Sequence, residues 1–77
     1  MRVHIQWPGS QPLEKKSDEW EARDAITKRY PSADFSPRKK VGGLVPGFAP
    51  TGFDEGIVVF PDKTSKDPIA VIWFPVP

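Results

Sequence analysis

Few residues in this chain could carry out catalysis. Among its 77 residues there is one histidine, His4, and there is no cysteine. A Ser-His-Asp triad needs a histidine to accept the proton of the serine, and a structural zinc site needs several cysteine or histidine ligands. His4 lies in no motif, and one isolated histidine is weak evidence for a catalytic centre. We therefore expect a protein that is not an enzyme and that needs neither a metal nor another cofactor.

Carboxylates offer a second route to chemistry, because a pair of them can act as general acid and general base without a histidine. The available candidates all lie in segments that we expect to form turns: Asp34, Asp54, Glu55, Asp62 and Asp67. Aspartate in a turn usually accepts hydrogen bonds from nearby backbone amides. Their spacing also differs from that of a calcium-binding loop, so we interpret them as turn residues.

A short basic run at residues 38–40 is the feature that most favours nucleic-acid binding. Phe35 precedes it, and Phe48 and Phe53 follow. Basic side chains that neutralise phosphates, together with aromatic rings that stack on bases, hold single-stranded nucleic acids. The whole chain, however, has 11 basic and 10 acidic side chains, and its net charge of +1 gives no strong field to attract a polyanion. We keep nucleic-acid binding as the alternative function, carried by Arg38, Lys39 and Lys40.

An apolar loop follows the basic run. Residues 31–55 hold four of the ten prolines and four of the six glycines, so regular structure in this region must be short. Long loops without secondary structure are uncommon in compact domains and are usually functional or mobile. The part over residues 41–55 is rich in apolar side chains, and we expect a binding surface formed by Leu44, Val45, Phe48 and Phe53.

Hydrophobic periodicity predicts the first two elements. Apolar residues alternate with polar ones over residues 2–7, which predicts a strand with one buried face that carries Val3, Ile5 and Trp7. We then expect one amphipathic helix over residues 12–30. The early start is favoured because Leu13 and Trp20 fall on the same helical face. A shorter helix that begins at residue 18, with Ser17 as its cap, is the alternative.

The last third of the chain predicts an antiparallel hairpin with strands over residues 56–60 and 69–74, and a weaker edge strand is expected over residues 33–40. Both hairpin strands are apolar at every position, as in strands that are buried on both faces. One helix can cover only one face. The residues that we expect on the other face are Val58, Phe60, Ile72 and Phe74.

Small soluble domains hide large apolar patches, so something must pack on this second face, and there are two alternatives. In the first, which we favour, the loop at residues 41–53 folds back over the sheet. In the second, another chain covers it, either a second copy of this chain or a different protein.

Together these patterns predict a single α+β domain over residues 1–77, with one helix packed on a three- to four-stranded, mainly antiparallel sheet in the order β-α-β-β-β. For function we expect a small non-enzymatic binding or regulatory protein that uses the loop or an uncovered sheet face. Its partner would be another protein or a second copy of the chain. Neither a signal peptide nor the roughly 20 apolar residues of a membrane-spanning helix is apparent, so we expect a cytoplasmic protein that is not bound to a membrane.

Overall fold

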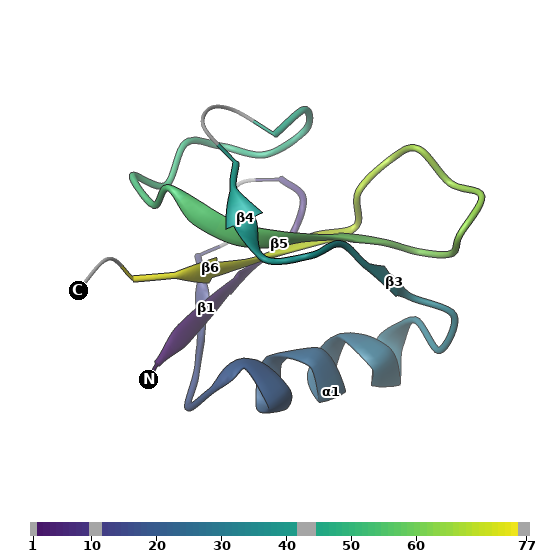
Figure 1. Cartoon of the computed structure of the whole chain (residues 1–77), viewed down its shortest axis with the longest axis horizontal. Coiled ribbons are helices and arrows are strands. Elements are labelled where there is room, and N and C mark those ends of the chain that lie inside the picture. The colour runs from purple at the N-terminus through teal and green to yellow at the C-terminus, as the bar shows by residue number, and fades with distance from the viewer. Residues whose placement is uncertain (1, 10–11, 42–44, 76–77) are drawn as a thin grey trace.

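The computed structural model describes residues 2–9, 12–41 and 45–75, and consists of one helix packed on a six-stranded antiparallel sheet (Figure 1). The elements are β1 (Val3–Gln6), β2 (Glu14–Lys16), α1 (Glu19–Arg29), β3 (Asp34–Phe35), β4 (Lys39–Lys40), β5 (Glu55–Phe60) and β6 (Ala70–Phe74). The strands lie in the order β2-β1-β6-β5-β3, and β4 also pairs with β5. The predicted α+β class is therefore confirmed, although the sheet has more strands than the three or four expected.

The strand β6 is central to the sheet, because it pairs with β1 on one side and with β5 on the other. All five of its residues are buried, which explains why its sequence is apolar at every position. The predicted hairpin of residues 56–60 with 69–74 is confirmed, and in its register Ile57 lies opposite Ile72 and Val59 lies opposite Ala70.

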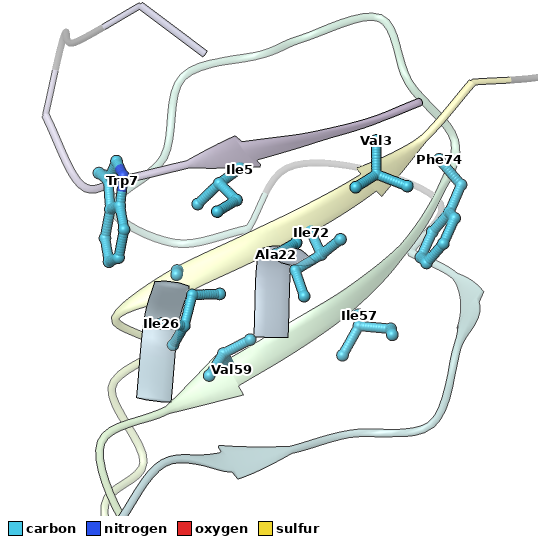
Figure 2. Packing of buried hydrophobic residues seen from close by; sticks show 10 residues of the cluster. Val3, Ile5, Trp7, Ala22, Ile26, Ile57, Val59, Ile72 and Phe74 are labelled. Carbon is cyan, nitrogen blue, oxygen red and sulfur yellow. The ribbon is translucent and has the colours of Figure 1, made fainter. Parts of the chain in front are cut away.

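The main core lies between α1 and the sheet (Figure 2). Full burial of each large apolar side chain contributes about 1.5–3 kcal/mol, so these contacts are a principal source of stability. The buried members are Val3, Ile5 and Trp7 of the N-terminal segment, Ala22 and Ile26 of α1, Ile57 and Val59 of β5, and Ala70, Ile72 and Phe74 of β6.

The helix is shorter than predicted, since it begins at Glu19 and not at residue 12. Its N-cap is Asp18, whose side chain accepts a hydrogen bond of 2.9 Å from the backbone N–H of Glu21. Of the two predicted starts the later one is nearly right, but the cap is Asp18 and not Ser17. No helix within the described ranges is long and apolar enough to cross a membrane.

Residues 14–16, which were predicted to be helical, form the edge strand β2 and pair with β1. Leu13 therefore packs against the second hydrophobic cluster, which contains Val71 and Trp73 of β6 and lies on the opposite side of the sheet from α1. Trp20 is 71% exposed on α1. The inference that Leu13 and Trp20 share one buried helical face was wrong, because a three-residue charged strand separates the two residues and has no hydrophobic pattern of its own.

The predicted edge strand over residues 33–40 is divided into β3 and β4, which pair with β5 on either side of Pro37. Proline has no N–H to donate to the ladder, so the pairing is interrupted there. Ser36 bridges the gap with two hydrogen bonds to Val58. Its backbone N–H donates to the Val58 carbonyl at 3.0 Å, and its hydroxyl accepts from the Val58 N–H at 2.9 Å.

The predicted distribution of side chains between the two sheet faces needs a correction. Ile72 and Phe74 lie in the core on the helix side, together with Ile57 and Val59, and not on the second face. Alternation decides which residues of one strand share a face, but the relation between two strands depends on their register. The register of the hairpin places Ile57 directly opposite Ile72, so these two residues must point to the same side.

The loop after β4 covers part of the second face. Val45 and Phe48 are buried in a second hydrophobic cluster with Val71 and Trp73 of β6. Of the two predicted covers, the loop and another chain, the loop is therefore the one that packs on this part of the face. Figure 1 places this loop and α1 on opposite sides of the sheet.

Candidate binding pocket

A pocket of about 200 Å³ lies between β6 and the loop on the second face of the sheet. The loop segment over residues 45–54 forms most of its wall. Three aromatic and two polar residues are part of the lining: Phe48, Phe53 and Trp73, and Thr51 and Asp54. The lining is therefore rich in aromatic residues and includes one acidic residue.

Two turns determine the shape of this segment. They contain glycines with positive φ angles, +87° at Gly47 and +83° at Gly52, which other residue types rarely adopt. After the first turn the ring of Phe48 is directed to the sheet and is buried. In the second turn the hydroxyl of Thr51 accepts a hydrogen bond of 3.2 Å from the backbone N–H of Phe53. The two turns thus determine the backbone positions of Phe48 and Phe53, the two aromatic residues that the loop contributes to the pocket.

Gln6 attaches the loop to the sheet. This residue is 3% exposed, and the only buried polar residue of the described core. Its side-chain oxygen accepts a hydrogen bond of 2.8 Å from the indole N–H of Trp73, and its side-chain nitrogen donates one of 2.7 Å to the carbonyl of Ala49. Because both ends of the amide are satisfied, Gln6 can be buried at little cost. Its two bonds link β1, β6 and the loop.

A stack of three aromatic rings extends from the edge of the pocket across the sheet. The rings of His4 and Phe53 have centroids 5.0 Å apart, and those of Phe53 and Trp73 have centroids 6.4 Å apart. Stacking on both sides holds Phe53, a loop residue, over the sheet. Among the described residues His4 makes no hydrogen bond to a carboxylate, so its observed contact is with the ring of Phe53.

The predicted loop residues are brought together in part. Val45, Phe48 and Phe53 all line the pocket, whereas Leu44 lies outside the described residues. Sequence reasoning missed Trp73 and Asp54 as lining residues. The uninterrupted apolar sequence of β6 did indicate that one of its faces meets the loop, but only the register identifies Trp73 as the residue that does so.

The basic run does not contribute to this pocket. Arg38 forms an ion pair with Glu55, and its guanidinium lies 3.9 Å from the centroid of the Phe74 ring. Lys39 and Lys40 are exposed and pair with β5, and as consecutive residues of a strand they point to opposite faces. The three predicted nucleic-acid contacts therefore do not present one continuous basic patch.

The described residues offer no arrangement for metal chemistry, since no group of three or more His, Asp or Glu side chains among them could hold a metal ion. The pKa of Asp62 is lowered by hydrogen bonds from Thr64 and Ser65, but these residues belong to the turn between β5 and β6 and not to the pocket.

No protein-family model, no curated protein and no solved structure matches this chain.

Proposed function

We propose that this chain is a small non-enzymatic protein-binding module that receives one side chain of its partner in the pocket formed by the loop and Trp73. The observation that supports this most directly is that the pocket is small and that aromatic residues form part of its lining. Sites for small molecules and cofactors usually have volumes of about 300–1,000 Å³. A pocket of about 200 Å³ is smaller and suits a single amino-acid side chain.

The lining also agrees with recognition of a protein. Protein interfaces obtain most of their binding energy from a few anchor side chains that fill well-packed pockets, and aromatic residues are enriched there. Here the rings of Phe48 and Trp73 are already held in place by the second cluster, and Phe53 is held by stacking. A pocket that is formed before binding has a smaller ordering cost when the partner arrives.

The test is whether peptides that bind the chain need this pocket. A displayed library of random peptides is selected on the purified chain, and the affinities of the selected peptides are measured by fluorescence anisotropy. Ala49→Phe places an aromatic side chain at an exposed position of the pocket wall and keeps the carbonyl that Gln6 uses. We expect this variant to bind the selected peptides at least about tenfold more weakly, the loss of one anchor contact.

The matched control is Ser32→Phe, which adds the same ring at an exposed position between α1 and β3. We expect this variant to bind with the affinity of the wild-type chain. Equal affinities of the two variants would show that the selected peptides bind elsewhere, and the proposed function of the pocket would be wrong.

A further inference from the structure

We propose that the exposed side of α1 is the contact surface of a weak symmetric dimer, in which two copies of this chain pair their helices in antiparallel orientation. Figure 1 places α1 and the loop of the pocket on opposite sides of the sheet, so such a dimer leaves both pockets open. The inference therefore goes beyond the proposed function and does not depend on it.

The first observation is the exposure of Trp20. This side chain is 71% exposed, whereas Trp7 and Trp73 are buried. The guanidinium of Arg23 lies over the Trp20 ring, and an ion pair of 2.8 Å with Glu19 holds that guanidinium. Tryptophan and arginine are the residue types most enriched among the anchors of protein interfaces. Trp20 is thus a large side chain that is already positioned but not covered.

The second observation is the set of residues around Trp20. Helix positions three, four and seven residues further along lie on the same side, and these positions hold Arg23, Asp24 and Thr27. Trp20, Asp24 and Thr27 are exposed. The Thr27 hydroxyl donates a hydrogen bond of 2.8 Å to the Arg23 carbonyl, so a ring that packs on Thr27 would leave no hydroxyl without a partner. We call these four residues the helix stripe.

The helix stripe is complementary to itself when two helices run antiparallel. With a two-fold axis between residues 23 and 24, Trp20 of each copy lies opposite Thr27 of the other, and Arg23 lies opposite Asp24. A large ring thus meets a small side chain, and a basic residue meets an acidic one. The same symmetry brings Glu19 near Lys28 of the second copy, which is again a pair of opposite charges.

This charge pattern is the reason for choosing a second copy as the occupant. Opposite charges favour one register and orientation of two surfaces, and like charges disfavour the others. A parallel pairing would set Arg23 against Arg23 and Asp24 against Asp24. The 11 residues of α1 span only about 16 Å, so the interface is small and belongs to the weak class. We expect a dissociation constant on the order of 100 µM.

Sedimentation equilibrium of the whole chain measures this association. The average mass should rise from nearly that of a monomer at about 20 µM to nearly that of a dimer at about 1 mM. Trp20→Ala should weaken the association at least about tenfold. In ¹⁵N NMR spectra the indole N–H signal of Trp20 should shift over the same concentrations, whereas those of Trp7 and Trp73 should not.

A charge exchange tests the antiparallel orientation. Arg23→Glu and Asp24→Lys each bring like charges together in the dimer, so each variant alone should associate more weakly than the wild-type chain. An equimolar mixture of the two variants should associate more tightly than either alone, because the introduced glutamate meets the introduced lysine and the remaining arginine meets the remaining aspartate.

The matched controls are Lys66→Glu and Asp67→Lys, which reverse a neighbouring basic and acidic residue in the exposed turn between β5 and β6. We expect both control variants, alone and mixed, to associate like the wild-type chain. The peptide measurements on the pocket are made at low micromolar concentration, where the chain is mainly monomeric, so they test the proposed function separately.

Three results would overturn the inference. A monomeric mass at about 1 mM would show that the chain does not pair. Association that persists unchanged in Trp20→Ala would show that another surface is used. A mixture of Arg23→Glu and Asp24→Lys that associates no better than the separate variants would exclude the antiparallel pairing.

Discussion

The indole N–H of Trp73 donates a hydrogen bond of 2.8 Å to the side-chain oxygen of Gln6, a residue 67 positions away in the chain. Both side chains are 3% exposed, so neither group can exchange this bond for one to water without moving. The nitrogen of the same amide binds the carbonyl of Ala49. One buried side chain on β1 therefore holds both the central strand and the loop that forms the pocket.

Replacement of Gln6 should therefore lower the stability of the folded chain. Gln6→Leu keeps the approximate volume but leaves the Trp73 N–H and the Ala49 carbonyl without their partner, and we expect the free energy of unfolding to fall by about 2–3 kcal/mol. Urea denaturation measures this change. Hydrogen exchange of the amides in residues 45–54 should also become faster, because the loop loses its attachment to the sheet.

A double-mutant cycle shows whether the loss belongs to the Gln6–Trp73 contact. Trp73→Phe removes the donor and keeps an aromatic ring, so it should cost less in the Gln6→Leu background than in the wild-type chain, by about 1 kcal/mol. Additive effects of the two substitutions would contradict the proposed coupling.

The exposure of Trp20 leads to a second prediction. The guanidinium carbon of Arg23 lies 5.3 Å from the centroid of the Trp20 ring, which is an exposed cation–π interaction. Trp20→Ala should therefore change the free energy of unfolding by no more than about 1 kcal/mol. Ile26→Ala on the same helix leaves a cavity in the core and should cost about 2–5 kcal/mol. Denaturation curves of the two variants measure this contrast.

Fluorescence provides an independent measurement of the same exposure. Trp7 and Trp73 are 5% and 3% exposed, whereas Trp20 is 71% exposed, so iodide should quench mainly Trp20. Trp20→Phe should remove most of the quenching. Strong quenching that persists in this variant, or a loss of stability as large as that of Ile26→Ala, would place Trp20 in a buried environment instead.

The central elements of the fold were predictable because the sequence pattern within each segment is enough to indicate its secondary structure. Alternation identified β1, and the β-branched and aromatic runs of residues 57–60 and 69–74 identified the hairpin. The start of α1 was not, because Leu13 and Trp20 have the spacing of one helical face, and only the pairing of residues 14–16 with β1 excludes a helix that begins at residue 12. β2 consists of three charged residues, and only its pairing with β1 makes it a strand.

The pocket was predictable only on its loop side. Val45, Phe48 and Phe53 are apolar residues in a loop, and this is unusual enough to indicate a buried or binding role. The contribution of Trp73 depends on the register of the hairpin, and that of Gln6 depends on contacts with residues 43 and 67 positions away. Such long-range contacts leave no pattern in a single sequence, so a buried glutamine looks like any polar residue of a half-exposed strand.

The turn between β5 and β6 gives a pH-dependent prediction. One carboxylate oxygen of Asp62 accepts hydrogen bonds from the hydroxyl of Thr64 at 2.7 Å and from the backbone N–H groups of Thr64 and Ser65 at 2.8 Å each. These bonds, with the Thr64 side chain as the largest contribution, lower the pKa of Asp62 from its ordinary value of 3.8. Because the pKa is lower in the folded state, the charged carboxylate stabilises the turn above the ordinary value, and this stabilisation is lost as the pH falls through the folded value.

Asp62→Ala should therefore be less stable than the wild-type chain at neutral pH, and the difference should shrink as the pH falls from about 5 towards 2. Denaturation at a series of pH values measures the difference, and titration of the Asp62 carboxyl carbon by NMR measures the pKa directly. Asp67→Ala is the control, because its carboxylate accepts no hydrogen bond among the described residues, and its effect should not follow this pH dependence. A carboxyl pKa of Asp62 at or above 3.8, or a stability difference that stays constant to the lowest pH, would mean that the three hydrogen bonds do not favour the charged form.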